Sequence, residues 1–135
     1  MEARRLKTGA KGARFERDLL RFLDYKGFAV MRAPSSGGEL SPLDVVAIKR
    51  GLVLAIEAKN YAAKPRLDAD KVRRMQDWCT RAGAIGILAW KKPRKVEPFP
   101  EQSTWLFLPF TDAAAGSYAD ENWVPMELFL KAFDA

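Results

Sequence analysis

Two acidic residues and one lysine lie within apolar segments near the middle of the chain. Asp44 precedes the apolar run Val-Val-Ala-Ile, and Glu57 and Lys59 end the run Leu-Val-Leu-Ala-Ile-Glu-Ala-Lys. The pair Arg50-Gly51 between these runs is typical of a tight turn, so the stretch predicts an antiparallel hairpin. In a register symmetric about that turn, Asp44 lies opposite Glu57, and Lys59 shares their face because side chains alternate along a strand.

This arrangement of charges is costly unless a cation compensates it. Like charges directly opposed on a sheet destabilise it by up to about 1 kcal/mol, and a half-buried carboxylate is neutralised through a raised pKa when no cation holds it. A divalent metal ion bound by both acids removes both costs. The simpler alternative is a salt bridge between Lys59 and one of the acids on a solvated sheet face. The metal site also depends on register, because an uncompensated three-residue loop would move Asp44 to the other face.

The residue types that are absent restrict the chemistry further. The chain has no His and a single Cys, Cys79. This excludes Ser-His-Asp triads, histidine general bases, zinc held by histidine, an internal disulfide and thiolate metal clusters. A metal ion must therefore be held by oxygen atoms, which suit Mg²⁺ or Mn²⁺. Cys79 itself is most simply a small buried hydrophobic residue.

The composition predicts a folded protein that binds nucleic acid. The 135 residues are 48% hydrophobic, which is enough for one domain with its own core. The net charge is +6, but residues 1–100 carry 22 Lys and Arg against 11 Asp and Glu. We expect such a basic body to bind nucleic acid rather than a membrane, because no basic helix with a broad apolar face accompanies it. A basic surface that serves only solubility is the alternative.

The remaining segments predict helices and strands in alternation. Residues 1–11 hold four basic residues without an apolar period, so we expect a flexible basic arm over 1–11 and one folded domain over 12–135. The predicted elements are a helix over 12–25, a strand over 28–33, a Ser/Gly loop over 34–42, a helix over 68–82, strands over 84–90 and 104–110, and a helix over 126–133. No run resembles a signal peptide or a membrane span, so we expect a cytoplasmic, nucleoid-associated protein.

Glu16, in the first predicted helix, lies at the margin of the apolar stripe formed by Phe15, Leu19, Phe22 and Leu23. An acid in that position can reach a neighbouring sheet. A first-turn acid favoured by the helix dipole is the alternative.

Four candidate positions follow one another in order: Glu16 in the first helix, Ser36 in the Ser/Gly loop, Asp44 at the start of a strand, and Glu57-Ala58-Lys59 thirteen residues later. In this order, and in the runs 11–17 and 27–34, the chain resembles the archaeal Holliday junction resolvases, which belong to the PD-(D/E)XK nuclease superfamily. The resemblance covers about residues 11–95. Two features depart from it. The family often has Gln near the start of the second helix, where this chain has Lys71, and no family motif is identified in the last thirty residues.

The resemblance implies a fold and an activity. The fold would be α/β, a single domain with a central mixed β-sheet flanked by helices, as in restriction-endonuclease-like nucleases. The activity would be that of a structure-selective endodeoxyribonuclease that resolves four-way DNA junctions by paired symmetric nicks, in recombination and repair. Two other functions stay open: a related DNA repair or restriction-like endonuclease, and a non-catalytic module that binds branched DNA. The acids argue against a pure binding module, since acids facing phosphate weaken binding.

The resemblance also implies a role for each site residue. Asp44, Glu57 and the backbone carbonyl of Ala58 would ligate Mg²⁺, with Mn²⁺ as a possible substitute, and Glu16 would complete the site directly or through water. Lys59 would orient the nucleophilic water or stabilise the transition state, as electrostatic catalysis requires. Ser36 would position the scissile phosphate; turn chemistry is the ordinary role of a serine in such a loop.

The two-fold symmetry of a four-way junction implies a homodimer with one active site per chain. Candidate interface residues are the aromatic ones near the end of the chain, although core packing explains them equally well: Trp105, Phe107, Phe110 and Phe129. We expect DNA contacts to rest mainly on phosphates and to depend strongly on salt. The candidate contact residues are Lys11, Arg14, Arg32, Ser35, Ser36, Lys64, Lys91 and Lys92.

Overall fold

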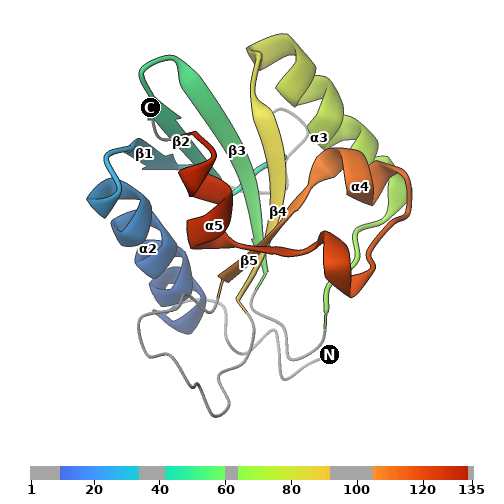
Figure 1. Cartoon of the computed structure of the whole chain (residues 1–135), viewed down its shortest axis with the longest axis horizontal. Helices are drawn as coiled ribbons and strands as arrows, with labels where there is room; N and C mark the ends of the chain where they lie inside the picture. Colours follow the sequence, from blue (N-terminus) through green and yellow to red (C-terminus); the bar gives the residue numbers. More distant parts are fainter. Residues whose placement is uncertain (1–9, 34–41, 60–63, 92–104, 134–135) are drawn as a thin grey trace.

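Apolar residues concentrated in short segments build a six-stranded sheet in the computed structural model of this protein (Figure 1). The structure describes residues 10–33, 42–59, 64–91 and 105–133, with side chains from residue 16 onward. The helices are α2 (Ala10–Tyr25), α3 (Ala69–Ala82), α4 (Phe110–Ala114) and α5 (Met126–Lys131). The strands are β1 (Ala29–Arg32), β2 (Val45–Lys49), β3 (Leu52–Lys59), β4 (Ile85–Lys91), β5 (Trp105–Pro109) and β6 (Val124–Pro125). A short 3₁₀ turn spans Asp120–Asn122.

The sheet is mixed, as expected from the resemblance. Its strands follow the chain order from β1 to β6. β3 and β4 run parallel, joined by the crossover through α3, and every other neighbouring pair is antiparallel. The expected α/β architecture, a central mixed sheet flanked by helices, is therefore confirmed.

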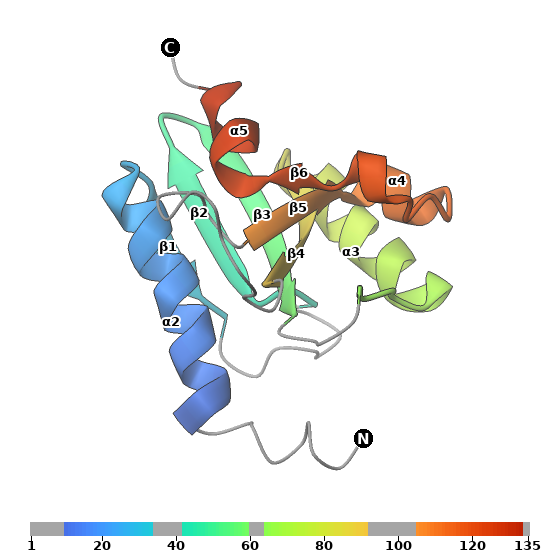
Figure 2. The same cartoon turned by 60° about the horizontal axis from the view of Figure 1, so that its bottom comes forward.

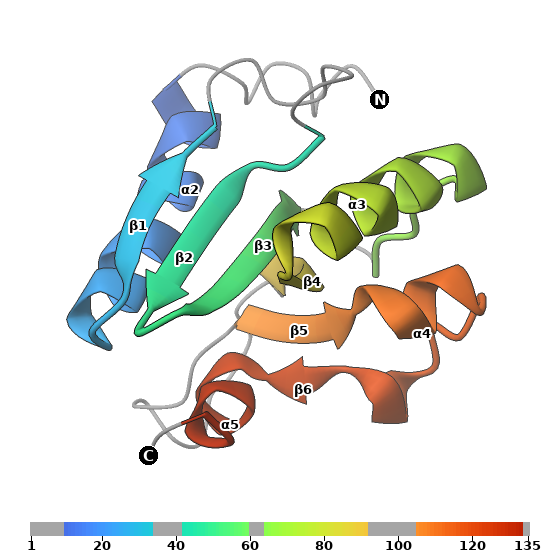
Figure 3. The same cartoon turned by 90° about the horizontal axis from the view of Figure 1, so that it is seen from above.

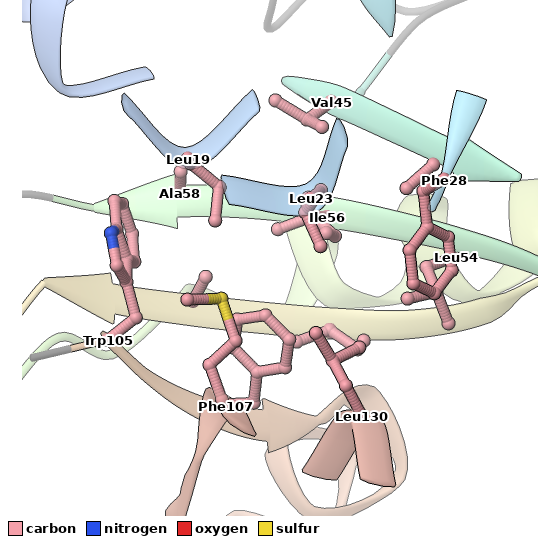
Figure 4. Close-up of a cluster of buried hydrophobic side chains, with 14 residues drawn as sticks. Leu19, Leu23, Phe28, Val45, Leu54, Ile56, Ala58, Trp105, Phe107 and Leu130 are labelled. Carbon is pink, nitrogen blue, oxygen red and sulfur yellow. The ribbon is translucent and has the colours of Figure 1, made fainter. Parts of the chain in front are cut away.

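Helices cover both faces of the sheet (Figure 3). α2 and α5 pack on one face through an apolar cluster that includes Leu19, Leu23, Ile56, Phe107 and Leu130 (Figure 4). α3 and α4 pack on the other face through a second cluster. Residues of β4 alternate between the two clusters, so this strand is buried on both faces. Residues 84–90 form a near-continuous apolar run, which is the pattern expected of such a strand.

Helix α3 has the ends that its sequence predicted. Asp68 caps its start, because the side chain accepts a hydrogen bond from the backbone N–H of Lys71 at 2.8 Å. Gly83 ends it with φ 68°, a left-handed conformation that favours glycine. The helical spacing of Val72, Met75, Cys79 and Ala82 predicts one apolar stripe, and its first three members are buried. Its last predicted member, Ala82, is exposed instead, since the helix ends there and turns toward β4.

The aromatic residues near the end of the chain mostly belong to the core. Trp105, Phe107 and Phe110 are buried in the two clusters, and Phe129 is partly buried with an edge contact to Phe107. Core packing, one of the two explanations left open by the sequence, therefore accounts for these residues. In the described ranges, no helix has both the length and the apolar character needed to cross a membrane.

The register of the sheet brings the ends of several strands together at one end of the sheet. Arg32, the last residue of β1, pairs with Val45 at the start of β2, and Lys59 at the end of β3 pairs with Trp90 near the end of β4. The first turns of α2 and α3 lie at this same end of the sheet (Figure 2). All the candidate site residues within these elements therefore come from one end of the molecule.

Candidate active site

The hairpin of β2 and β3 brings the two acids together. Its turn residues Arg50 and Gly51 both have positive φ, 51° and 89°. A two-residue hairpin turn of the type that matches strand twist requires positive φ at both positions. The strands pair Val45 with Ile56. The register symmetric about the turn is therefore confirmed, even though Arg is an unusual residue in the left-handed conformation.

Asp44 is held rigidly at the start of β2. Its backbone N–H donates to the carbonyl of Ile56 at 3.0 Å, and its own carbonyl accepts from the N–H of Ala33 at 2.8 Å. The carboxylate Oδ2 accepts a hydrogen bond from the backbone N–H of Ala58 at 2.9 Å. Because Asp44 is only 6% exposed, these bonds fix the direction of the carboxylate before any ligand binds.

Glu57 is the least satisfied charged group of the site. It is 4% exposed, and its Oε2 atom lies 3.4 Å from Nζ of Lys59 and 3.5 Å from Nζ of Lys71. Its other oxygen, Oε1, is buried and has no hydrogen-bond partner within the described part of the chain. Burial, followed by repulsion from Asp44, raises the pKa of Glu57 from 4.5 to about 7, while the two lysines oppose that rise.

These donors fit a hard divalent cation. The carboxylates of Asp44 and Glu57 and the carbonyl of Ala58 supply only oxygen ligands, which Mg²⁺ prefers. The buried, unpartnered Oε1 of Glu57 carries a cost that a bound cation would remove. No group of three or more Asp, Glu, Cys or His residues within the described ranges is placed to hold a metal ion. A site here therefore rests on two acids and the backbone.

Glu16 does not join the two acids in this structure. Its Oε1 lies 2.6 Å from Nε of Arg32, with side chains 18% and 46% exposed respectively. The reason is strand alternation: Ile56 and Ala58 face α2, so Glu57 between them faces α3. The expectation that Glu16 reaches the sheet is met by its contact with β1, whereas its role as a metal ligand stays a prediction.

The candidate DNA contacts that belong to the described elements lie around the same end of the molecule. Three of them have acidic partners: Arg32 pairs with Glu16, Lys64 Nζ lies 2.6 Å from Asp120 Oδ1, and Lys91 Nζ lies 4.0 Å from Asp18 Oδ2. Lys11 and Arg14 belong to the first turns of α2, and their side chains are not described. Ser35, Ser36 and Lys92 lie outside the described residues.

Lys71 is the site residue that the sequence did not assign. The resemblance marked its position only as a departure, because the family often has Gln there. The structure places its ammonium group on Glu57, across the gap between α3 and β3. The sequence signal was weak, since a lysine in the first turn of a helix is ordinarily a solvated residue.

The fold and the site together define a class of protein. A mixed sheet flanked by helices, with a buried acid pair and a lysine on a central hairpin, is the arrangement of restriction-endonuclease-like nucleases. The family model for "Archaeal holliday junction resolvase (hjc)" matches residues 7–131. The chain belongs to this family, whose nucleases are metal-dependent.

Individual relatives agree with the family assignment. The crossover junction endodeoxyribonuclease Hjc of Archaeoglobus fulgidus is 39% identical over 102 residues, covering 74% of this chain and 69% of the relative. The protein of the same name from Sulfurisphaera tokodaii is 30% identical over 89 residues, and the match covers 63% of this chain and 62% of that protein. The solved structure of the Archaeoglobus fulgidus Hjc, a Holliday junction resolvase, matches with a TM-score of 0.59 at 35% identity, over 73% of this chain and 77% of that one.

Proposed function

We propose that this protein is a Holliday junction resolvase that cuts four-way DNA junctions by Mg²⁺-dependent hydrolysis of phosphodiester bonds. One observation carries the proposal most directly: the buried pair of Asp44 and Glu57, with an unpartnered carboxylate oxygen and two flanking lysines, in a chain that belongs to the resolvase family. Such a pair is unfavourable as structure alone, and it is well suited to hold a cation against a phosphate.

Each residue has a distinct part in this function. Asp44, held by the N–H of Ala58, and Glu57, through Oε1, would hold Mg²⁺ together with the carbonyl of Ala58. A cation bound there supplies charge neutralisation on the phosphate and lowers the pKa of a water molecule. Lys59, on the same face as Glu57, orients the attacking water or stabilises the charge that develops on the phosphate. Mn²⁺ would substitute, because it takes the same oxygen ligands.

The wider organisation is also part of the proposal. The two-fold symmetry of a four-way junction favours a homodimer, with one active site for each of the two opposed cuts. Residues 12–135 form the nuclease domain, and the basic residues of 1–11 add phosphate contacts to it. Ser36, in the segment just before Asp44, would position the scissile phosphate, and Ser35 would contact DNA. The site of action is DNA in the cytoplasm, in association with the nucleoid.

Cleavage of a labelled immobile four-way junction tests the proposal. We expect the wild type to nick two opposed strands at symmetric positions in Mg²⁺ and in Mn²⁺. Asp44→Asn should lose at least about 10³-fold in rate while it binds the junction as tightly as the wild type, since the lost carboxylate is a cation ligand rather than a phosphate contact. Asp77→Asn is the matched control, because Asp77 is exposed on α3 and pairs with Arg81 at 3.3 Å.

The pattern of cuts separates the alternatives. Cuts confined to linear duplex or to flaps, with the junction left intact, would assign the protein to another branch of the nuclease superfamily. Tight, salt-sensitive junction binding without cleavage in either metal would overturn the enzymatic function altogether. Sedimentation of the protein with and without the junction tests the homodimer independently of cleavage.

A further inference from the structure

Two ammonium groups converge on one oxygen of a buried carboxylate. Nζ of Lys59 and Nζ of Lys71 lie 3.4 Å and 3.5 Å from Oε2 of Glu57. Lys59 belongs to the strand that carries Glu57, whereas Lys71 comes from the first turn of α3, which Asp68 caps. The side chain of Lys71 is 16% exposed, so it is withdrawn from bulk water rather than extended on the surface.

The charges at this place balance without a metal ion. With both acids ionised, Asp44 and Glu57 supply two negative charges, and Lys59 and Lys71 supply two positive ones. A divalent cation at the oxygens of the acids adds two positive charges close to both lysines. Like charges a few ångströms apart in a partly buried site repel strongly. The cation and both lysines therefore occupy the site together more favourably when another anion joins them, and the anion that this nuclease binds is a DNA phosphate.

We propose that Lys71 is a second catalytic lysine, which rests on Glu57 in the absence of metal and transfers to the scissile phosphate when a divalent cation takes over the charge of Glu57. The flexible four-carbon stem of lysine allows such an exchange between neighbouring acceptors. This inference rests on the proposed function, and it adds to it a second phosphate contact from α3. The exchange of Lys71 would also make the cation and the phosphate bind cooperatively. The phosphate offsets the repulsion between the cation and the lysines, and the cation frees Lys71 to contact the phosphate.

Cation binding to the DNA-free protein is the first test. The variants are Lys71→Gln and Lys71→Met, which remove the charge, and Lys71→Arg, which retains it. Arg73→Gln is the matched control, because Arg73 is an exposed residue of the same helix that pairs with Asp70. Isothermal titration with Mn²⁺ should show about tenfold tighter binding to both neutral variants, since the nearby repulsion is gone, and wild-type affinity for Lys71→Arg and the control.

Single-turnover cleavage of the junction at saturating Mg²⁺ is the second test. Both neutral variants should cleave about 10²-fold more slowly than the wild type, because a donor to the charge developing in the transition state is lost. Lys71→Arg should recover most of that loss. The cooperativity is measured directly by the ratio of the Ca²⁺ affinities with and without the junction. This ratio should be smaller in the neutral variants than in the wild type.

The outcomes separate this inference from the function on which it rests. Tighter cation binding combined with slower cleavage supports it. Unchanged or weaker cation binding by both neutral variants overturns it and reduces Lys71 to a residue that only steadies Glu57. An inactive wild type would overturn the proposed function. The cation titration without DNA would still show whether the charge of Lys71 opposes cation binding. Far-ultraviolet circular dichroism of each variant establishes that the comparison is made between folded proteins.

Discussion

The two faces of the sheet are built from similar apolar clusters, but their charged side chains differ in burial and in partners. On the α2 face, Glu16 and Arg32 pair with each other at the rim and remain in contact with solvent. On the α3 face, Glu57 is buried against Asp44, with two lysines on one oxygen and no described partner on the other. On the α2 face, the two charges of this pair compensate each other. On the α3 face, the buried Oε1 of Glu57 lacks a hydrogen-bond donor among the described residues, and such an unsatisfied buried group is where a ligand is expected to act.

The largest effect should follow from removing the negative charge of Glu57 on the α3 face. Glu57→Gln keeps the shape of the side chain and removes a cation ligand, so we expect junction cleavage to fall by at least about 10³-fold. Junction binding should change less than threefold. Single-turnover cleavage and an electrophoretic binding assay measure the two quantities. A variant that cleaves within tenfold of the wild type would show that Glu57 is not a ligand.

The apolar clusters should contribute to stability on both faces alike. Leu23 on the α2 face and Met75 on the α3 face are both fully buried. We expect Leu23→Ala and Met75→Ala each to lower the free energy of unfolding by about 2–5 kcal/mol, through lost burial and the cavity left behind. Urea denaturation measures both changes. A loss under 1 kcal/mol at either position would mean that its cluster is not a core in solution.

The metal-free protein should lose stability as the pH rises. Folding raises the pKa of Glu57 from 4.5 to about 7, so the folded state binds the proton more tightly than the unfolded state. Stability from this group is fully present below pH 4.5 and is lost as the pH rises through 7, by about 3 kcal/mol in all. Unfolding in the presence of a chelator, compared between the wild type and Glu57→Gln, isolates this contribution. A difference between the two proteins that is flat from pH 5 to pH 8 would contradict it.

The smallest effect should come from the ion pair on the α2 face. Because Arg32 is about half exposed, the pair with Glu16 should stabilise the protein by about 0.5 kcal/mol, and less at high salt. A double-mutant cycle with Glu16→Gln and Arg32→Met measures the coupling. The cleavage rate of Glu16→Gln gives the sharper comparison. If Glu16 also binds the cation, the variant cleaves much more slowly than the wild type, although its free energy of unfolding is almost unchanged.

Local patterns were enough to predict most of the fold. The helix start at Asp68 and its end at Gly83, the hairpin turn at Arg50-Gly51, and the doubly buried strand β4 all follow from residues within a few positions of one another. The short elements α4 and β6 had no such signal, since α4 begins at Phe110, where the sequence predicted the end of a strand. Their conformation depends on packing against the sheet rather than on local propensity.

The sequence by itself determined the acid pair. The turn at Arg50-Gly51 sets the register, and strand alternation then places Asp44 and Glu57 on one face, whatever the rest of the chain does. Only the tertiary structure decided which charged groups reach that face. The docking of α3 delivers Lys71 to Glu57, and the docking of α2 on the opposite face leaves Glu16 with Arg32. Contacts between distant elements depend on how whole faces pack, and residue spacing along the chain does not encode that.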